Sequence, residues 1–411
     1  MTKIAIIGGG ITGITTAYTL AKQGFDVTLI EGHRYAGMET SLANGGQLSA
    51  SNAEVWTHWG TLLQGMKWIF KSDAPLLINP KLSWHKLTWF ASFMANIPNY
   101  EKNTIETARL AISARKYLFA WAKEEGIDFD LRRQGILHIY RNKSSFTRAG
   151  KVTGLLAKGG LNRIALGPEE MRTIEPTLSG NFYGGYFTEC DSTGDIHKFT
   201  HGLSEAIISL GVKSLYGHQV TKIKSDGKSV EINLVHQGQY HREIFDKVVV
   251  CAGVSSRNIA SQLGDKLNIY PVKGYSITVN LHDAKSKSSA PTISLLDDET
   301  KLVTSRLGID RLRVAGTAEF NGLNKDIRAD RIKPLVDWVE QHFPEVSTRS
   351  VTPWSGLRPM TPSLMPKVGR GSKANVFYNT GHGHLGWTLS AITAQMVAES
   401  IGIAIESKLS L

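Results

Sequence analysis

The feature that most constrains the fold is a glycine pattern near the start of the chain, set between two short apolar runs. Residues 4–7 are rich in branched side chains, as a strand buried on both faces of a sheet should be. Gly8, Gly10 and Gly13 follow in the spacing Gly-x-Gly-x-x-Gly. A helical pattern then runs over residues 11–23. The sequence therefore predicts a strand, a tight turn and a helix, which is the unit that holds the pyrophosphate of a dinucleotide.

Each glycine has its own role in such a unit. The first permits the tight turn, the second lets the backbone approach a pyrophosphate, and the third lets the helix lie close to the sheet. Residues 25–30 are predicted as the second strand, and Glu31 ends it where a carboxylate accepts hydrogen bonds from a ribose. A glycine turn that binds nothing is the alternative, although strand, helix, strand and acid all occur in register. We therefore predict an α/β fold with a Rossmann-like dinucleotide-binding domain.

The residues after Glu31 separate the common dinucleotides. An acid at this position disfavours a 2′-phosphate and leaves NAD and FAD open. Residues 37–48 form a loop of small and hydroxyl side chains with little to bury, which suits a cofactor whose ring system lies under the chain. With this loop and Arg34, the sequence resembles the FAD-dependent amino-acid oxidase and dehydrogenase superfamily, where the corresponding loop runs along the diphosphate and the isoalloxazine. The resemblance implies FAD.

Length and composition describe an ordinary globular enzyme. With 411 residues, 41% hydrophobic and 20% charged, the chain can bury a large core and make two or three domains. Two cysteines give neither a disulfide framework nor a metal cluster, so we expect a reducing compartment and no metal site. The first strand begins almost at once, and no apolar run reaches the roughly eighteen residues of a spanning helix. A cytoplasmic location is expected.

The chain is basic, with a formal net charge of +11. Its lysines and arginines are scattered and no run of them dominates, which argues against a nucleic-acid partner. An anionic membrane surface or an anionic substrate fits the charge better, and a soluble protein with excess surface lysine is the simple alternative.

Residues 55–100 differ in composition from the rest of the chain. They contain five of the nine tryptophans, which are Trp56, Trp59, Trp68, Trp84 and Trp89. Tryptophan and lysine around an apolar face are typical of an element that lies in a membrane interface. A buried lid that packs over the flavin explains the same composition, and both interpretations stay open. Prolines break the segment, so we predict two short helices and a turn.

Later segments predict a second domain built around an antiparallel sheet. Helical patterns cover residues 103–126, 145–158, 197–210 and 334–342, and strands are predicted at 135–140, 270–279, 292–296, 302–305 and 311–317. An Asp-Gly pair predicts a hairpin within a meander of strands at 218–223, 230–235 and 245–250. We assign 1–54, 180–265 and 346–411 to a discontinuous FAD-binding domain, and 55–179 and 266–345 to a substrate domain that includes the tryptophan-rich segment.

A group of small residues follows the strand predicted at 245–250. Cys251, Ala252 and Gly253 let the backbone lie against a cofactor, which resembles the second flavin-contact motif of the superfamily. Val220 corresponds to the position whose backbone meets the adenine. His197, at the start of a predicted helix, is a weaker candidate near the flavin, because a histidine that faces solvent is the commoner explanation.

One arginine stands amid proline, glycine and apolar residues in the block 354–362. We predict that Arg358 is held in a stiff, sheltered loop, where its guanidinium can bind a carboxylate through two parallel hydrogen bonds. An ion pair with a structural Asp or Glu is the alternative. We favour the carboxylate of a substrate.

A second glycine-rich block, residues 379–388, leads into a helix that is predicted to reach about residue 403. Glycines at a helix start leave backbone N–H groups free, and the helix dipole favours negative charge there. Reduced flavin carries negative charge around N1 and its C2 carbonyl oxygen, so the block suits it. His382 and His384 are poor evidence for a metal, because two histidines without further partners do not make a site.

Together these blocks resemble one family closely, the bacterial D-amino acid dehydrogenases, often called the small subunit. The resemblance spans nearly the full chain and is carried by IIGGGITGITTAYTLAKQG, ETSLANGGQLSASNAEVW, YPVKGYSITV, WSGLRPMTP and NTGHGHLGWT. His384 stands where a small polar residue is usual, and Ser363, Leu364 and Met365 replace an Asp-Gly pair, so the substrate range is open. A relative that acts on D-proline or D-hydroxyproline is therefore an alternative.

The resemblance also implies a set of site residues. Arg358, Tyr275 and His384 are the candidate catalytic residues, with Arg358 and Tyr275 on the substrate carboxylate. The residues expected to bind FAD are Gly8, Gly10, Ile11, Thr12, Gly13, Glu31, Gly32, Arg34, Thr40, Ser41, Ala43, Asn44, Gly45, Gln47, Leu48, Val220, Cys251, Ala252, Gly253, Gly356, Arg358, Gly381, His382, Gly383, His384, Leu385, Gly386, Trp387 and Thr388.

The implied reaction is hydride transfer from the α-carbon of a D-amino acid to flavin N5, after which water hydrolyses the imino acid to a 2-oxo acid and ammonia. Electrons are expected to pass to a quinone or a respiratory-chain acceptor, with the tryptophan-rich segment as a docking surface and a peripheral contact with the inner membrane. A flavin-dependent NAD(P)H reductase would need a second glycine-rich unit, and we find none. A flavin-binding scaffold without turnover is the third interpretation.

Overall fold

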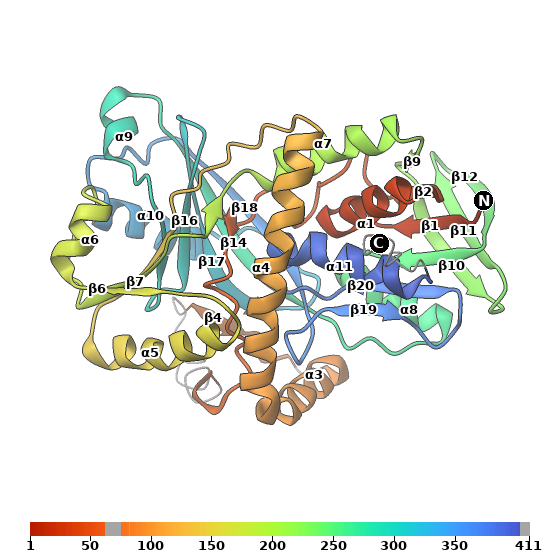
Figure 1. Cartoon of the computed structure of the whole chain (residues 1–411), viewed down its shortest axis with the longest axis horizontal. Helices are drawn as coiled ribbons and strands as arrows, with labels where there is room; N and C mark the ends of the chain where they lie inside the picture. Colours follow the sequence, from red (N-terminus) through yellow and green to blue (C-terminus); the bar gives the residue numbers. More distant parts are fainter. Residues whose placement is uncertain (62–74, 82, 403–411) are drawn as a thin grey trace, which may run out of the picture.

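Two β-sheets organise the chain, and Figure 1 places them at opposite ends of the long axis. The structure is a computed structural model that describes residues 1–61, 75–81 and 83–402. One sheet has six strands and the other has nine, while a sheet of three strands lies beside the six-stranded one. The predicted α/β fold, with a dinucleotide-binding unit and a second sheet, is confirmed.

The six-stranded sheet contains the amino-terminal unit. In spatial order its strands are β19 (Lys367–Arg370), β20 (Val376–Thr380), β13 (Lys247–Val250), β1 (Lys3–Ile7), β2 (Asp26–Glu31) and β9 (Lys213–Tyr216). All neighbours are parallel except β19 and β20. Ile4 and Ile6 of β1 pack into the core on one face, whereas Ala5 and Ile7 pack into the core on the other. Burial on both faces explains why β1 is a continuous apolar run.

Helices cover one face of this sheet. They are α1 (Ile11–Lys22), α7 (Ile196–Ser209) and α11 (Gly386–Ser400), and α1 packs against both of the others. The opposite face packs against α8 (Ser256–Leu263) and the three-stranded sheet. The helix that begins at the glycine turn is therefore fixed by packing on two sides.

The three-stranded sheet corrects one prediction. Its strands are β10 (Gln219–Ser225), β11 (Val230–His236) and β12 (Gln239–Phe245), and the Asp-Gly hairpin joins the first two as predicted. The strand predicted at 245–250 exists at Lys247–Val250 as β13, but its place in the meander is wrong. The chain leaves β12 at Phe245, turns at Asp246 and enters β13 of the six-stranded sheet. A continuous run of three valines is typical of a strand buried on both faces, not of a meander strand with one face in water.

The nine-stranded sheet is larger than predicted and is mixed. In spatial order its strands are β18 (Val351–Met360), β14 (Tyr270–Asn280), β17 (Arg311–Phe320), β16 (Leu302–Leu307), β15 (Ser294–Asp297), β5 (Ile136–Tyr140), β7 (Gly184–Thr188) and β6 (Ile164–Leu166), with β4 (Leu76–Ile78) paired to β17. The predicted antiparallel pairing holds for β14 to β17, but β15 with β5 and β17 with β4 are parallel. α10 (Ala329–His342) packs against the core on one face.

The strand pairing bears on the predicted domain boundaries. β7 and β18 belong to the nine-stranded sheet, although residues 180–265 and 346–411 were assigned to the FAD-binding domain. The chain thus crosses between the two sheets more often than the composition indicated. The division into two domains itself stays a prediction.

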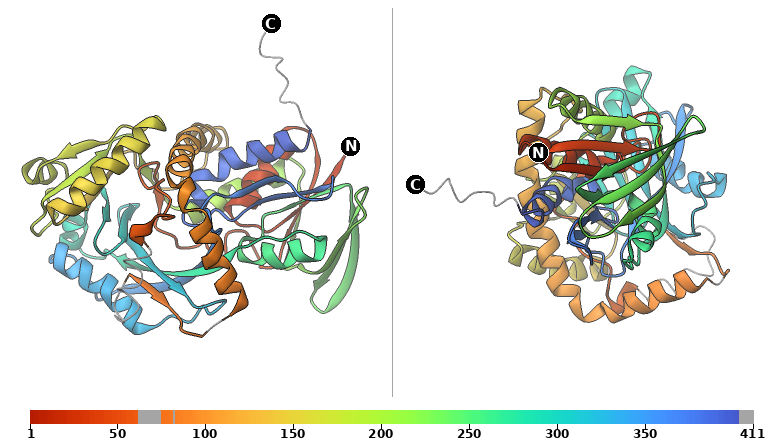
Figure 2. Two further views of the ribbon diagram at one scale, coloured as in Figure 1. Left: turned by 90° about the horizontal axis from the view of Figure 1, so that it is seen from below. Right: turned by 90° about the vertical axis from the view of Figure 1, so that its right-hand side faces the viewer.

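The remaining described elements lie outside the two large sheets. They are α3 (Trp84–Ala95), η1 (Ile97–Asn99), α4 (Tyr100–Glu124), α5 (Lys143–Lys158), α6 (Pro168–Ile174), η2 (Gly253–Ser255), α9 (Ala284–Ser289) and the strand pair β3 (Gln47–Leu48) and β8 (Ser192–Thr193). The long α4 runs across the front of the molecule in Figure 1 and packs against α11 and α5. The three-stranded sheet lies at the far end of the molecule from α5 and α6 (Figure 2).

The tryptophan-rich segment contains both buried and exposed tryptophans, and neither the lid nor the membrane interpretation is settled by this. Trp89 of α3 is 2% exposed and donates its indole N–H to the Met360 carbonyl (2.8 Å), as a packed lid should. Trp84 and Trp59 are 80% and 65% exposed. One of the predicted helices is α3, whereas the other, with Trp68, falls largely outside the described residues. Strand β4 was not predicted.

Candidate active site

A cavity of about 1020 Å³ lies between the six-stranded and the nine-stranded sheets. It opens at the carboxyl ends of the four parallel strands β1, β2, β13 and β20, where ligands bind in open α/β sheets. Its volume is at the upper end of the roughly 300–1,000 Å³ that small-molecule sites occupy. The cavity is therefore large enough to hold a cofactor together with a substrate.

Glycines bring two distant segments of the chain together at one end of this cavity. Gly8 has a φ of +109°, and a Cβ there would lie 2.7 Å from the Cys251 carbonyl oxygen and 3.0 Å from the Ala252 Cα. A Cβ on Gly13 would lie only 1.8 Å from the Gly8 carbonyl oxygen. The first and third glycines thus have the roles that the sequence predicted, since one allows a turn beside Cys251 and the other lets α1 approach β1.

Polar groups at the start of α1 fit a pyrophosphate and a ribose. Gly10, the residue that caps α1, supplies no side-chain hydrogen bond to the free N–H groups of the first turn. The hydroxyl of Ser41 accepts from the Ile11 amide at 3.0 Å. The carboxylate of Glu31 accepts from the amides of Gly9 and His33, and lone pairs on both oxygens remain for a ribose hydroxyl. These donors and acceptors are those that a dinucleotide requires.

Residues 381–388 line the same wall of the cavity as the turn after β1 and residues 251–253. Asn379 donates its side-chain amide to the Thr16 hydroxyl of α1 at 2.9 Å, which ties β20 to the glycine turn. Residues 381–388 line the cavity, and α11 begins after Leu385 without a side-chain cap. The buried indole N–H of Trp387 has no hydrogen-bond partner among the described residues. A bound cofactor with carbonyl oxygens would supply acceptors to these groups, so the residues present fit FAD.

Arg358 lies in the cavity wall, and one prediction about it is wrong. It belongs to strand β18, not to a loop. Its guanidinium donates to the carbonyls of Thr317 (2.6 Å) and Gly316 (3.4 Å) on β17, and no acid pairs with it in the part of the chain that the structure describes. Burial without a counterion lowers its pKa to about 10, so the group stays cationic at neutral pH. The remaining N–H donors are available to a ligand.

The backbone that receives Arg358 is unusual. Thr317 has a φ of +57°, a left-handed conformation that branched residues rarely adopt. The register between β14 and β17 shifts in the same region. Strained backbone of this kind persists only where the surrounding structure holds it, and it clusters at functional sites.

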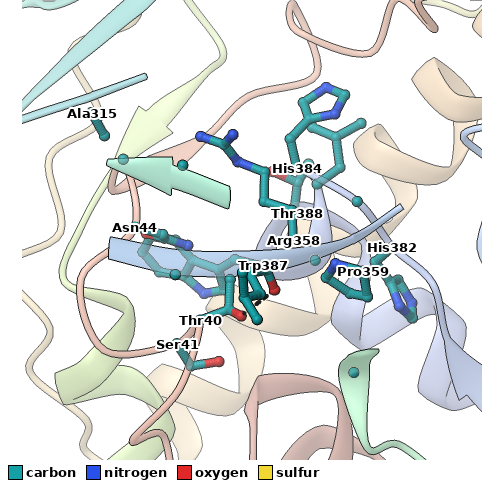
Figure 3. Close-up of a pocket in the computed structure, with 18 of the residues that line it drawn as sticks. Thr40, Ser41, Asn44, Ala315, Arg358, Pro359, His382, His384, Trp387 and Thr388 are labelled. Carbon is teal, nitrogen blue, oxygen red and sulfur yellow. Dashed lines mark hydrogen bonds between the residues drawn. The ribbon is translucent and has the colours of Figure 1, made fainter. Parts of the chain in front are cut away.

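His384 and Trp56 form an aromatic wall beside Arg358. Their rings are stacked, with centroids 4.8 Å apart and an angle of 17° between the planes. The Nε2 of His384 donates to the Asn52 carbonyl at 3.2 Å, which fixes the tautomer and leaves Nδ1 as an acceptor. Burial, with Arg358 nearby, lowers the pKa of His384 to about 4, so the ring is neutral. Figure 3 shows the side chains of Arg358 and His384 next to each other.

The loop that carries Trp56 is anchored by a buried acid. Asp191 accepts from the amides of Ala50 and Ser51, each at 3.0 Å, and Arg115 lies 3.5 Å away. The Ser51 hydroxyl in turn contacts the Nε2 of His138 at 2.9 Å. The position of the aromatic wall therefore depends on a carboxylate outside the cavity.

The structure does not bring every predicted residue into the cavity. Tyr275 lines the cavity, but its hydroxyl donates to Glu319 at 2.9 Å and its side chain is 1% exposed and packs against the core of the nine-stranded sheet, so its role on the substrate carboxylate stays a prediction. Arg34 is exposed, lies over the ring of Tyr35 and does not line the cavity. Leu48 belongs to the core. Gly13 acts through packing alone, and every other predicted cofactor residue lines the cavity.

His197 is also outside this cavity. It lies in the first turn of α7 and lines a shallow depression beside residues 125–128. The commoner explanation, a histidine at a helix start, therefore accounts for it.

Sequence reasoning missed residues that line the cavity from the nine-stranded sheet and its neighbours. Among them are Gly274, His138, Tyr140, Arg163, Lys301, Val303 and Thr317. They come from separate strands and loops and form no local pattern. Only the alternation along β5, which sets His138 and Tyr140 on one face, was a usable signal.

Comparisons with known proteins agree with this geometry. A family model described as FAD dependent oxidoreductase matches residues 3–400. A relative from Mesorhizobium japonicum, named D-amino acid dehydrogenase 3, is 58% identical over 398 residues, which are 97% of this chain and 96% of that protein. A D-amino acid dehydrogenase from Dechloromonas aromatica is 39% identical over 407 residues, again 97% of this chain and 96% of that protein.

Solved structures share the fold at low sequence identity. Glycine oxidase from Geobacillus kaustophilus has a TM-score of 0.76 at 20% identity and covers 98% of this chain and 95% of its own. L-alpha-glycerophosphate oxidase from Mycoplasma pneumoniae, solved with FAD bound, has a TM-score of 0.72 at 16% identity, with coverage of 98% and 95%. At these identities the likeness establishes the fold alone.

Proposed function

The chain belongs to the family of FAD-dependent oxidoreductases, and from this premise we propose that it oxidises D-amino acids to 2-oxo acids and ammonia. Its cofactor is FAD. The resemblance of its sequence blocks to the D-amino acid dehydrogenases, and the names of relatives that match almost its whole length, support the substrate class. The single observation that carries the proposal within the cavity is the unpaired guanidinium of Arg358.

Arg358 is suited to hold the carboxylate of an amino acid. Its two hydrogen bonds to β17 carbonyls fix the plane of the guanidinium but do not neutralise its charge. A charge-assisted hydrogen bond to a carboxylate contributes on the order of 1.5–3 kcal/mol, and two can form in parallel. Binding in this way would hold the α-carbon at a fixed place in the cavity, as a near-attack geometry requires.

FAD supplies the redox chemistry when bound, because its ring accepts the hydride that leaves the α-carbon of the substrate. The chain contributes position and surroundings. The stacked rings of His384 and Trp56 limit the space beside Arg358, and neutral His384 adds no charge that would compete for the carboxylate. Water hydrolyses the imino acid product, so no residue of the chain is needed for that step.

The exposed face of α3 supports a peripheral contact with a membrane, where a quinone would take the electrons. Trp84, Leu87, Ala91 and Met94 recur at helical spacing and are all exposed. Tryptophan beside aliphatic side chains is typical of a helix that lies in the interface of a bilayer. Among the described residues, no helix is both long and apolar enough to span one.

Anaerobic reduction of the flavin tests the proposed reaction. The holoenzyme should lose its yellow colour on addition of D-amino acids but not of L-amino acids or NADH. Arg358→Gln should keep FAD bound and lower kcat/KM by roughly 10- to 1,000-fold, from the loss of one or two charge-assisted bonds. Bleaching by NADH alone would indicate a reductase, and bleaching by D-proline alone would narrow the substrate to cyclic imino acids.

Vesicle binding tests the membrane contact. The variant Trp84→Ser with Met94→Ser should sediment less with anionic phospholipid vesicles than the unchanged protein. Tyr240→Ser is a matched control, because Tyr240 is 81% exposed on β12, at a distance from α3. Equal sedimentation of all three proteins would rule out α3 as the contact.

A further inference from the structure

The cavity continues past the aromatic wall into a lobe between α5 and the nine-stranded sheet. Its walls include His138, Tyr140, Arg148, Arg163, Asp298 and Lys301. Three of these side chains, Arg148, Arg163 and Lys301, are cationic, which suits an anionic group. The charge of the lobe therefore bears on which substrate side chains fit there.

The cations of the lobe differ in their partners. Arg148 and Lys301 both pair with Asp298, at 3.5 and 2.7 Å. Glu54, another carboxylate of the cavity wall, accepts from the Tyr100 hydroxyl at 2.6 Å. For Arg163, by contrast, no ion pair is found among residues 1–61, 75–81 and 83–402.

Arg163 is held in place, but not all of its hydrogen-bond donors have an acceptor among the described residues. One N–H contacts the Tyr140 hydroxyl at 3.4 Å, and the guanidinium lies over the ring of Tyr186, 5.0 Å from its centroid. Its Nε is buried and has no hydrogen-bond partner among the described residues. A buried, unpaired guanidinium donor is costly unless an acceptor arrives. His138, whose pKa is lowered by burial and by Arg163 itself, stays neutral and does not add to the positive charge.

Strand spacing gives the lateral separation of the two strands that the arginines contact. Arg358 is bound to carbonyls of β17, and Arg163 contacts Tyr140 of β5, which is the third strand along through β16 and β15. Three spacings of about 4.8 Å amount to roughly 14 Å. An ion pair at each end takes up about 4 Å. About 6 Å is left, which is on the order of the four bonds, about 1.5 Å each, between the two carboxyl carbons of a five-carbon amino acid.

We propose that Arg163 is a second carboxylate site, and that the preferred substrates are D-amino acids whose side chain ends in a carboxylate, with D-glutamate the best length. This inference rests on the proposed function, because it assigns the substrate class of the same cavity. Arg358 holds the α-carboxylate, and Arg163 receives the carboxylate of the side chain.

A comparison of D-glutamate with D-glutamine tests the proposal, since the two differ in charge but hardly in size. The unchanged enzyme should have a kcat/KM at least tenfold higher for D-glutamate. Arg163→Gln should lower kcat/KM for D-glutamate by roughly 10- to 100-fold, as expected for the loss of a charge-assisted pair, and change that for D-glutamine by less than threefold. Arg163→Lys should keep part of the preference. Lys151→Gln on α5, exposed and outside the cavity, is the control for loss of one positive charge.

Binding without turnover gives a second measurement. Glutarate should perturb the flavin absorption spectrum at a lower concentration than butyrate does, and Arg163→Gln should remove the difference. Equal effects of glutarate and butyrate on the unchanged enzyme, or an equal loss for D-glutamate and D-glutamine in Arg163→Gln, would overturn the proposal while leaving the dehydrogenase reaction intact. An enzyme that oxidises no D-amino acid, yet still prefers glutarate through Arg163, would instead contradict the proposed function.

Discussion

The guanidinium of Arg358 occupies the space that a side chain on Gly274 would need. A Cβ built on Gly274 lies 2.4 Å from the Arg358 Cζ and 2.4 Å from its Nη2. The two residues are on neighbouring strands, β14 and β18, and the arginine crosses over the glycine to reach the carbonyls of β17. Glycine at this position is therefore required by the proposed substrate site, although it carries no functional group.

Gly274→Ala should displace Arg358 without unfolding the sheet, because the atoms in the way are the end of a flexible side chain. We expect kcat/KM for D-amino acids to fall by roughly 10- to 100-fold, in line with one lost charge-assisted bond, while the flavin content stays the same. Gly154→Ala on α5 has open space around it and is the control. Full activity in Gly274→Ala would mean that Arg358 does not hold the substrate from its present position.

Substitutions at Gly13 and Gly10 should separate the effect on helix packing from the effect on cofactor binding. Gly13→Ala places a Cβ 1.8 Å from the Gly8 carbonyl oxygen, so it should lower the melting temperature even without FAD. Gly10→Ala meets only the Ser41 hydroxyl, at 3.6 Å, and should leave the apoprotein stable but weaken FAD binding. Melting curves of both apoproteins, with FAD titrations, would check this. A stable Gly13→Ala apoprotein would contradict the packing argument.

His382 should make the folded protein sensitive to acid. Burial lowers its pKa to about 3, whereas in the unfolded chain it takes up a proton near its ordinary pKa of about 6.5. Between these values the unfolded state binds more protons, so the free energy of unfolding falls as pH falls, by up to about 1.4 kcal/mol per pH unit. Urea unfolding at pH 7.5, 6 and 5, at one fixed excess of FAD, would give a shallower pH dependence for His382→Gln. Parallel curves for the two proteins would show that other groups dominate.

Asp191→Asn should disturb the loop that carries Trp56. The carboxylate uses both oxygens, one for the Ala50 amide and one for the Ser51 amide, so replacing either oxygen by NH₂ sets a donor against a donor. We expect a loss of about 2–4 kcal/mol in stability and a higher KM. Asp226→Asn is the matched control, because Asp226 serves the amides of Lys228 and Ser229 through one oxygen that asparagine keeps. An unchanged melting temperature for Asp191→Asn would contradict the anchoring role.

Most of the residues predicted to bind FAD line the cavity, because the sequence information behind those predictions is local. The turn at Gly8, the acid at Glu31 and the block at 381–388 each combine a strand end with small residues, and such patterns can be read within a short stretch. Their meeting at one cavity followed from the rule that ligands bind at the carboxyl ends of parallel strands.

The substrate half could not be predicted in the same way, because it depends on strand pairing across the nine-stranded sheet. Arg358 looked like a loop residue, since proline and glycine surround it, yet β18 pairs with β14 over its whole length. The alternation of β14 places the Tyr275 side chain on the face opposite Gly274, where its hydroxyl donates to Glu319, and the sequence alone did not show this. Arg163 reaches the cavity only because β6 pairs with β7, and no local motif encodes that pairing.

The pairing of β1 with β13 also limits when the FAD cavity can form while the chain is being synthesised. β1 leaves the ribosome long before its partner on one side, which lies at 247–250, and before the helix that begins at Gly386 and whose start lines the cavity. Until residues 247–250 have emerged, one edge of β1 is unprotected, and the cavity wall is incomplete until the chain past Gly386 has emerged. FAD can therefore be held fully only after segments more than 370 residues apart, from Gly8 to Gly386, are both present and folded.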